Sequence, residues 1–337
     1  MNQKTYTEHP GRAVEDKRFS HMMALALDPN SGYKRGVIRC ITSREGDVEI
    51  KGYVDRSQLY TISGDSLEHF TVGERLKIKN EKEVLEKLTP KKWECIGLED
   101  PDIWIDEKTK LTHVYFTIPI KSSDSEKKIR IHLGHATGKD LRSLEMTDPV
   151  LLDNQVLGAS AKEVSIAPVN SKGVRYNLIE SRDREPEATY SIVRVAVAED
   201  MGKQWQYGET VFHPTEHNIP WIGGHASPGP LFPRSFIDVG EGKLLGVMNG
   251  REANKKIGDQ ITYGMFSVGL FIYDYENGKI EWVSPNPFIR DSEARTITFA
   301  SQFVETSPSE GILYAHVDDS FVRAYTLYAE GIGAMLP

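Results

Sequence analysis

Four hairpin-like segments recur along this chain of 337 residues, and their spacing constrains the fold more than any other feature. Each segment has an apolar run of alternating pattern, a turn of small residues with one Asp or Asn, and an aromatic or apolar residue after the turn. Further strand-like pairs lie between them, at 103–116, 164–179, 231–248 and 303–315. The turn residues are 75, 60 and 77 residues apart, and they are Asp65, Asp140, Asp200 and Asn277.

About five units of this length, each with four strands, predict an all-β fold: a five-bladed β-propeller with four-stranded antiparallel blades. A blade cannot bury both of its faces alone, so blades stack against one another around an axis. A pair of β-sandwiches is the alternative, which the even spacing disfavours. We expect residues 20–337 to form a single catalytic propeller domain, residues 1–19 to be a polar tail, and the insertion 77–92 to suit a short exposed helix.

The composition narrows the class of protein further. The net charge is −8 and Lys and Arg are scattered, which argues against nucleic acid, because phosphates need a concentrated basic surface. No apolar run approaches the roughly 18 residues that a membrane span requires. The first 19 residues lack the apolar core of a signal peptide. Cys40 and Cys95 have no CxxC or metal-type partner. We therefore expect a cytoplasmic protein without membrane or nucleic-acid partners.

Charged residues recur where the innermost strands of a propeller would begin. Glu99 and Asp100, held by Pro101, open one such strand, and Lys162 and Glu163 open the next about one blade later. Arg39 belongs to a strand of the first blade. In a propeller these positions converge on the axis, so the pattern predicts one polar pocket there. Taken singly, the Asp-Pro pair is typical of an ordinary turn, and the Lys-Glu pair of an exposed surface.

Six motifs in the same order resemble glycoside hydrolase family 130, whose members are five-bladed propellers that cleave β-mannosides by phosphorolysis or hydrolysis. The resemblance covers nearly the whole chain. The motifs begin at Gly97-Leu98-Glu99-Asp100-Pro101, at Ala136-Thr137-Gly138, at Lys162-Glu163-Val164, at Gly224 after Trp221, at Leu244 (ending in Met248-Asn249-Gly250) and at Leu313-Tyr314-Ala315, which leads to Asp318.

The resemblance implies roles for the matching residues. Asp100 stands at the family's general acid, and Glu99 and Asp102 could supply the neighbouring negative charge that raises the pKa of such an acid. Lys162 and Arg39 stand at cationic positions that help to hold phosphate in phosphorylases, and Asp318 stands at an acid that holds sugar hydroxyls. We also expect Asn249 to shape the sugar and acceptor sites.

Two departures from the family's motifs favour hydrolysis slightly. Asp102 replaces the Arg of Glu-Asp-Pro-Arg, and Asn249 replaces the His of Tyr-His-Gly. A phosphate dianion needs clustered cationic donors, and both changes thin that cluster. In a hydrolase a second carboxylate must activate water. Glu163 is our candidate for this base, and Glu305 is a weaker one.

The substrate is accordingly expected to be a mannoside or oligosaccharide, with no cofactor beyond inorganic phosphate if the reaction is phosphorolysis. An inverting phosphorylase that releases mannose 1-phosphate, a propeller that binds glycans or proteins without chemistry, and a glycosidase for arabinosides or fructosides stay open as alternatives. Oligomeric state is also open.

Two aromatic residues of the Gly- and Pro-rich segment 220–230 are candidate substrate contacts. Trp221 is flanked by Pro220 and glycines, so we expect it to offer a stacking face to a sugar ring, with simple loop packing as the alternative. We expect His225 to lie near the axis as a substrate contact or as a structural histidine. We expect no metal site, because the spacings of His132 with His135 and of His213 with His217 do not suit a shared ion on strands or in a Pro-broken segment.

Overall fold

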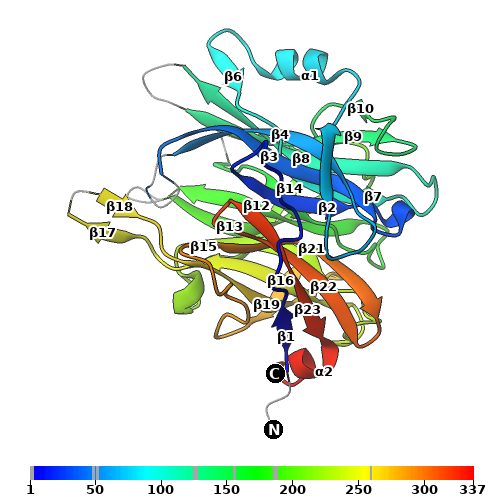
Figure 1. Ribbon diagram of the computed structural model, residues 1–337, viewed down its shortest axis with the longest axis vertical. Helices are drawn as coiled ribbons and strands as arrows, with labels where there is room; N and C mark the ends of the chain where they lie inside the picture. The colour runs from blue at the N-terminus through cyan, green and yellow to red at the C-terminus, as the bar shows by residue number, and fades with distance from the viewer. Residues whose placement is uncertain are drawn as a thin grey trace.

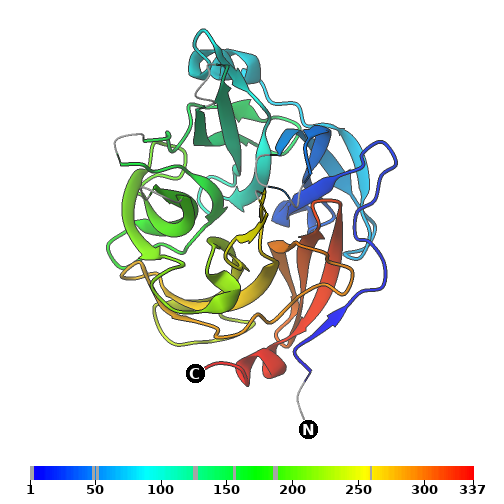
Figure 2. The ribbon, with the colours of Figure 1, turned by 90° about the vertical axis from the view of Figure 1, so that its left-hand side faces the viewer.

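The structure is a computed structural model that describes residues 4–47, 50, 53–123, 128–154, 157–184, 189–258 and 260–337. Its strands form five antiparallel blades around a central axis, as predicted, and Figure 2 looks along this axis. The blades follow one another in chain order (Figure 1). Blades three and four share one continuous sheet through a single parallel bridge between Ser191 and His225.

The strands of each blade run from the axis outward. The first blade contains β2 (Met22–Leu27), β3 (Arg35–Glu45), β4 (Val54–Ser63) and β5 (Thr71–Arg75). The second contains β7 (Glu99–Ile105), β8 (Thr112–Ser122), β9 (Ile129–Gly138) and β10 (Glu145–Met146), with β6 (Trp93–Cys95) also paired to β8. The third contains β11 (Lys162–Ser165), β12 (Arg175–Arg184), β13 (Thr189–Ala198) and β14 (Gln206–Phe212).

The last two blades complete the ring. The fourth contains β15 (His225–Leu231), β16 (Lys243–Arg251), β19 (Phe266–Asp274) and β20 (Lys279–Val283), and the hairpin of β17 (Lys255–Ile257) and β18 (Gln260–Thr262) extends from it. The fifth contains β21 (Thr298–Ser307), β22 (Glu310–Val317), β23 (Phe321–Tyr328) and β1 (Tyr6–Glu8). The helices are α1 (Glu81–Leu88), within the segment 77–92, and α2 (Ala329–Gly333), with 3-10 turns η1 (Pro29–Ser31) and η2 (Pro220–Ile222).

The four repeated turns of the sequence all join the third strand of a blade to the fourth. They lie between β4 and β5, β9 and β10, β13 and β14, and β19 and β20. The Asp or Asn folds the turn locally: Asp140 Oδ1, for example, accepts the backbone N–H of Arg142, and Asp200 Oδ1 accepts that of Gly202. The fifth blade lacks such a turn because its outermost strand comes from the opposite end of the chain.

Residues 4–19 are not a tail, and this corrects the expectation from the sequence. β1 pairs antiparallel with β23, from Tyr6 opposite Leu327 to Glu8 opposite Tyr325, and thereby closes the ring. Val14 is fully buried and bridges both Phe70 and Val322. In Figure 2 the blue first strand lies beside the red last blade. The polar composition misled the prediction because β1 is the outer strand of its blade, where side chains are only half-buried.

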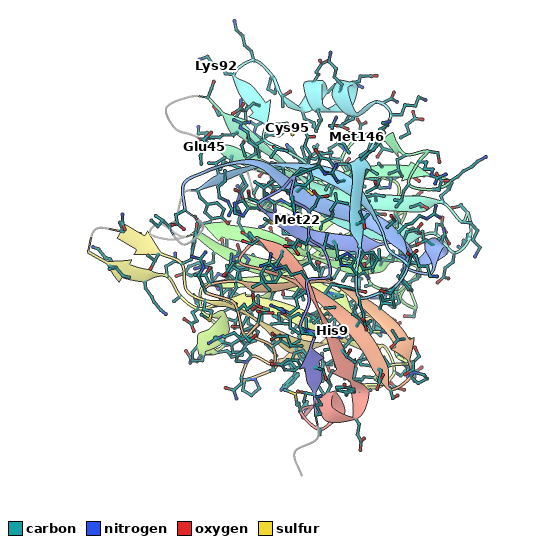
Figure 3. All side chains as sticks on the ribbon, viewed as in Figure 1. His9, Met22, Glu45, Lys92, Cys95 and Met146 are labelled. Carbon is teal, nitrogen blue, oxygen red and sulfur yellow. The ribbon has the colours of Figure 1, made fainter. Side chains whose placement is uncertain are left out.

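Five large hydrophobic clusters hold the blades together, one at each interface between neighbouring blades. Alternation along the strands explains why each blade can serve two interfaces. On β8, Val114 and Phe116 pack towards the first blade, whereas Tyr115 between them packs towards the third. On β12, Leu178 and Ile179 face opposite neighbours in the same way. Side chains fill the space between the ribbons, as around Met22 in Figure 3.

Each innermost strand carries a β-bulge, where its pairing with the second strand of the blade shifts. The register shifts occur between Met23 and Leu25, Glu99 and Asp102, Lys162 and Val164, Pro228 and Leu231, and Ala300 and Gln302. A bulge leaves one residue out of the ladder and turns its side chain. The fold therefore places unpaired residues from all five blades around the axis, and two of these residues, Asp100 and Glu163, are acids. In the described part of the chain, neither helix is long and apolar enough to cross a membrane.

Candidate active site

Two cavities meet on the propeller axis. The first has a volume of about 590 Å³ and contains Arg39, Lys162, His225 and Asp319 in its wall, and the second, of about 500 Å³, contains Asp102, Trp104 and Gln302. Asp100 and Glu163 line both cavities. These two acids therefore lie at the junction of the cavities. Below, the first is called the axial cavity and the second the far cavity.

The backbone at this junction is strained. Asp100 has φ +48° and Glu163 has φ +49°, in the left-handed region that non-glycine residues rarely adopt. Ala24, the bulge residue of the first blade, has φ +47°. Such conformations cost about 1–3 kcal/mol each, and they concentrate at functional sites. The bulges thus hold two acids, one from each of two neighbouring blades, at the axis.

Arg39 on β3 binds both acids of the Glu-Asp-Pro motif. Its Nη1 donates to Asp100 Oδ1 at 2.8 Å and its Nη2 donates to Glu99 Oε1 at 2.7 Å. Its Nε donates to Ser57 Oγ at 2.9 Å, and this hydroxyl donates to Glu99. The two carboxylates raise the pKa of Arg39, although burial acts in the opposite direction. Burial and the nearby Asp100 raise the pKa of Glu99. This guanidinium fixes one acid of the junction in an ion pair.

A second cluster surrounds Glu180 on β12, which is 1% exposed. Lys162 Nζ lies 3.2 Å from Glu180 Oε1, and His225 Nε2 lies 3.1 Å from Glu180 Oε2. Burial alone would raise the pKa of Glu180, but His225 and Lys162 outweigh it and lower the pKa to about 2. Burial lowers the pKa of His225. Glu180 thus orients two side chains that project into the axial cavity.

A third cluster comes from the first and fifth blades. His316 Nε2 lies 3.2 Å from Asp319 Oδ1, and the ring is stacked on Phe299. Arg44 binds Asp55 at 2.6 Å and lies 3.9 Å from Asp319. Burial would raise the pKa of Asp319, but His316 and the arginines lower it. An ionised carboxylate held in place by these partners can accept hydrogen bonds from sugar hydroxyls.

Glu163 differs from these acids. In the described part of the chain its carboxyl group makes no ion pair or hydrogen bond, and burial together with the charge of Asp100 raises its pKa well above the ordinary range. Asp102, whose carboxyl accepts the backbone N–H of Ile103, has a pKa raised to about 6 by burial. The junction therefore combines an ion-paired acid, Asp100, with an acid whose pKa is raised, Glu163.

The pKa shifts of Glu163 and Glu180 have opposite directions, so replacement by Gln should change stability in opposite directions at the two positions. The pKa of Glu163 is raised in the folded state above its unfolded value. The contribution of this group to stability is therefore lost as pH rises through the folded-state pKa. As a consequence, Glu163→Gln should stabilise the protein at pH 7. The pKa of Glu180 is lowered to about 2. Its contribution is present above the unfolded pKa and is lost as pH falls towards 2, so Glu180→Gln should cost about 3 kcal/mol at pH 7.

Urea unfolding of both variants between pH 4 and pH 8 measures this pair of effects. Both substitutions replace a carboxyl group in the wall of the axial cavity by an amide of the same size, so each is the matched control for the other. Equal changes in stability at pH 7 would contradict the assigned environments.

The structure brings together six of the residues predicted from the sequence. Arg39, Glu99, Asp100, Lys162, Glu163 and His225 all line the axial cavity. Asp102 instead lines the far cavity, because the bulge between Glu99 and Asp102 turns successive residues to different levels of the axis. Glu305 also lines the far cavity, where its carboxylate accepts a hydrogen bond from Ser235.

The prediction that Trp221 offers an open stacking face is wrong. Its side chain lies between the third and fourth blades and the residue is 4% exposed. Its Nε1 donates to Ser284 O at 3.0 Å. Gly250 and Gly269 make room for the ring, since a Cβ on Gly269 would lie 2.4 Å from it. The glycines near Trp221 in space thus serve packing, and the open loop inferred from Pro220 is the short turn η2.

We therefore expect Trp221→Ala to destabilise the fold by about 3–5 kcal/mol, the usual cost of removing a large buried aromatic side chain. Denaturant unfolding measures this effect. A stacking role would instead raise KM for the substrate while leaving stability nearly unchanged, and that outcome would contradict the packing seen here.

Asn249 and Asp318 also lie away from the cavity, which corrects their expected roles. Asn249 is fully buried, and its amide exchanges hydrogen bonds of 2.9 and 2.8 Å with the backbone of Ala300, which links the fourth blade to the fifth. The Asp318 carboxylate accepts the backbone N–H groups of Arg295, Thr296 and Ile297. These bonds lower its pKa against the effect of burial. Both residues organise the backbone.

Sequence reasoning missed several residues of the cavity wall, namely Tyr53, Glu180, Arg251, His316 and Asp319. Asp319 follows Asp318 directly, so the acidic pair was visible, but nothing in the sequence indicated which member faces the axis. Glu180 lies within a run of buried strand residues, 177–181, and a lone acid in such a run is a signal that could have identified it.

The histidines considered as metal ligands have other partners. His135 Nε2 lies 2.9 Å from His113 Nδ1, and His132 Nδ1 accepts the backbone N–H of Asp153. His213 Nδ1 lies 2.9 Å from Thr215 Oγ1. Among the described residues, no group of three or more His, Cys, Asp or Glu side chains is arranged to hold a metal ion.

The similarity of this chain to known proteins lies in its fold. No family model and no curated protein matches the chain. Among solved structures, the β-1,2-mannobiose phosphorylase from Listeria innocua, in complex with β-1,2-mannobiose, is 13% identical with a TM-score of 0.63, and the alignment covers 94% of this chain and 92% of the phosphorylase. The chain shares the five-bladed propeller fold. The similarity extends to members of glycoside hydrolase family 130, which confirms the resemblance predicted from the motifs at the level of the fold.

Two further structures show the same similarity. A glycosyl hydrolase from Bacteroides ovatus is 15% identical with a TM-score of 0.60, over 92% of this chain and 84% of the hydrolase. A mannose phosphorylase from Leishmania mexicana, in complex with a phosphate ion, is 13% identical with a TM-score of 0.56, over 100% of this chain and 92% of the phosphorylase.

Proposed function

We propose that this protein hydrolyses β-mannosides in the axial cavity, with Asp100 and Glu163 as the pair of catalytic carboxyl groups. The observation that carries the proposal is their shared position at the junction of two cavities, on strained bulges of neighbouring inner strands. Glycoside cleavage needs two carboxyl groups in opposite protonation states on either side of the scissile bond. The fold that holds this pair is similar to the fold of solved propellers that cleave glycosides, and this similarity supports the proposal.

The environments of the two acids assign their roles. Glu163 keeps its proton because of burial and the charge of Asp100, so Glu163 can donate that proton to the glycosidic oxygen. Asp100, ion-paired with Arg39, can accept a proton from the attacking water. The anomeric carbon then loses its bond to the leaving sugar and gains a bond to the water oxygen. This assignment is the reverse of the one that the family resemblance implies.

The wall of the axial cavity suits a sugar ring with several hydroxyl groups. Glu99, Glu180 and Asp319 are ionised or ion-paired acids that can accept hydrogen bonds from hydroxyls, and Lys162 and His225 can donate them. Tyr53, Phe266 and Phe299 supply aromatic surface in the same wall. A ring with several hydroxyls matches such a mixed set of donors, acceptors and aromatic faces.

Two features favour water over phosphate as the acceptor. Asp102, in place of the family's Arg, lines the far cavity as an acid, and Asn249, in place of the family's His, is buried in backbone contacts. Arg39 and Lys162 are already engaged by carboxylates. A phosphate dianion placed between these acids would meet more negative charge than free cationic charge.

Incubation of the protein with β-linked mannobioses and aryl β-mannosides, with and without inorganic phosphate, tests the proposal. We expect free mannose in both conditions. Strict dependence on phosphate with mannose 1-phosphate as the product would replace hydrolysis by phosphorolysis. If no mannoside or other glycoside is turned over but mannosides bind, the protein is a glycan-binding propeller.

A further inference from the structure

Arg251 is a buried cation in the wall of the axial cavity. It ends β16, pairs in register with His225 on β15 and with Phe266 on β19, and is 6% exposed. Its guanidinium carbon lies 4.7 Å from the centre of the Tyr263 ring and 5.4 Å from that of Phe266. Cation–π contacts of this kind orient a guanidinium but do not neutralise it.

Among the described residues, the polar partners of Arg251 are neutral. Nη2 donates to Gly224 O at 3.2 Å, and Nη1 donates to the side chain of Asn254 and, at 3.5 Å, to Glu252 O. In the described part of the chain, no carboxylate oxygen lies within 4 Å of its nitrogens. Burial lowers the pKa of this arginine.

Two other cations of the cavity wall have carboxylate partners. Arg39 binds Glu99 and Asp100, and Lys162 binds Glu180. Glu180 contributes to the electrostatic environment of Arg251, but its two oxygens already face Lys162 and His225. A buried charge without a counter-ion is costly, and the cost is offset when a ligand supplies the opposite charge.

We propose that Arg251 binds the carboxylate of an acidic sugar, so that the substrate of the proposed hydrolysis contains a uronic acid. This inference rests on the proposed function. A planar guanidinium recognises a carboxylate by two parallel hydrogen bonds. One unpaired guanidinium matches a single negative charge, whereas a phosphate dianion needs several clustered cations. The nearby rings of Tyr263 and Phe266 offer faces to the sugar that carries the carboxylate.

The experiment compares matched β-linked disaccharides that differ only in whether one sugar is neutral or its uronic acid, with the acid placed in turn at each end. The readout is the ratio of kcat/KM for the acidic substrate to that for the neutral one. We expect this ratio to favour the acidic substrate and to fall about 10- to 100-fold in Arg251→Gln, the equivalent of one charge-assisted hydrogen-bonded pair. Arg251→Lys, which keeps the charge, should retain part of the ratio.

Arg234→Gln is the matched control, since Arg234 is exposed and paired with Asp238 outside the cavity. The control should leave the ratio unchanged. Thermal unfolding of each variant identifies a change that comes from misfolding. If Arg251→Gln lowers turnover of the neutral and acidic substrates equally in a folded protein, the inference is overturned and the proposed hydrolysis stands.

A binding measurement separates this inference from the proposed function. Calorimetry with the acidic disaccharide and the Glu163→Gln variant, with and without Arg251→Gln, needs no turnover. Loss of binding only in the double variant supports the carboxylate site even if no glycoside is hydrolysed. Equal affinity in both proteins, or inorganic phosphate that binds with Arg251-dependent affinity while the acidic disaccharide does not, overturns it.

Discussion

Glu163→Gln and Asp100→Asn should each lower kcat for β-mannoside hydrolysis by about 10²- to 10⁴-fold, the usual contribution of a general acid or base. Both side chains line the two cavities where the inner strands bulge, and both substitutions preserve size and shape. Steady-state kinetics with a mannobiose measures the effect. Glu83→Gln is the matched control, because this residue lies exposed on α1, and it should leave kcat unchanged.

The identity of the leaving group tells the two roles apart. A proton donor is needed least when the leaving group is acidic, so Glu163→Gln should retain much more activity on a nitrophenyl β-mannoside than on a mannobiose. A missing base is not compensated in this way, so Asp100→Asn should be impaired on both. The pH profile should lose activity on the alkaline side, where Glu163 gives up its proton. The reverse pattern would return the donor role to Asp100, as the family resemblance implies.

Asp291→Ala should destabilise the protein by about 3 kcal/mol, because the buried Arg323 would lose its buried carboxylate partner and keep only the more exposed Glu293 and Glu8. Asp291 and Arg323 are 3% and 2% exposed and lie 2.6 Å apart, and Asp291 also accepts the hydroxyl of Tyr325. Glu8 of β1 lies 3.8 Å from the same arginine. The cluster therefore sits where the first strand closes the ring on the last blade.

Urea unfolding of Asp291→Ala measures the loss, and Asp238→Ala is its matched control. Asp238 forms an exposed ion pair with Arg234 at 2.9 Å, and such pairs contribute about 0–1 kcal/mol. A similar small loss for both variants would refute the structural importance of the closure cluster.

Several residues that line the axial cavity could be predicted from the sequence. The direction in which the other candidate side chains point could not be predicted. Arg39, Asp100, Lys162 and Glu163 were predicted to converge on the axis, and all four line the axial cavity. Asp100, Lys162 and Glu163 stand at the beginnings of inner strands, whereas Arg39 lies on β3, the second strand of its blade. Trp221, Asn249 and Asp318 belong to the same regions but face blade interfaces or backbone N–H groups. On a strand, a shift of one residue reverses the face, and each bulge introduces such a shift.

The order of the first four blades could be predicted from the sequence, because the repeated turn of each of these blades is a local structure: an Asp or Asn side chain can bond to its own backbone wherever the chain goes afterwards. Local sequence patterns did not predict β1. A half-buried outer strand has an ordinary polar composition, and its partner β23 is more than 300 residues away along the chain. The tertiary structure is needed to show that Asp319 rather than Asp318 lines the cavity, and that, among the described residues, Asp100 has an ion-pair partner and Glu163 has none. These outcomes depend on burial and on charges from different blades, which meet only when the ring closes.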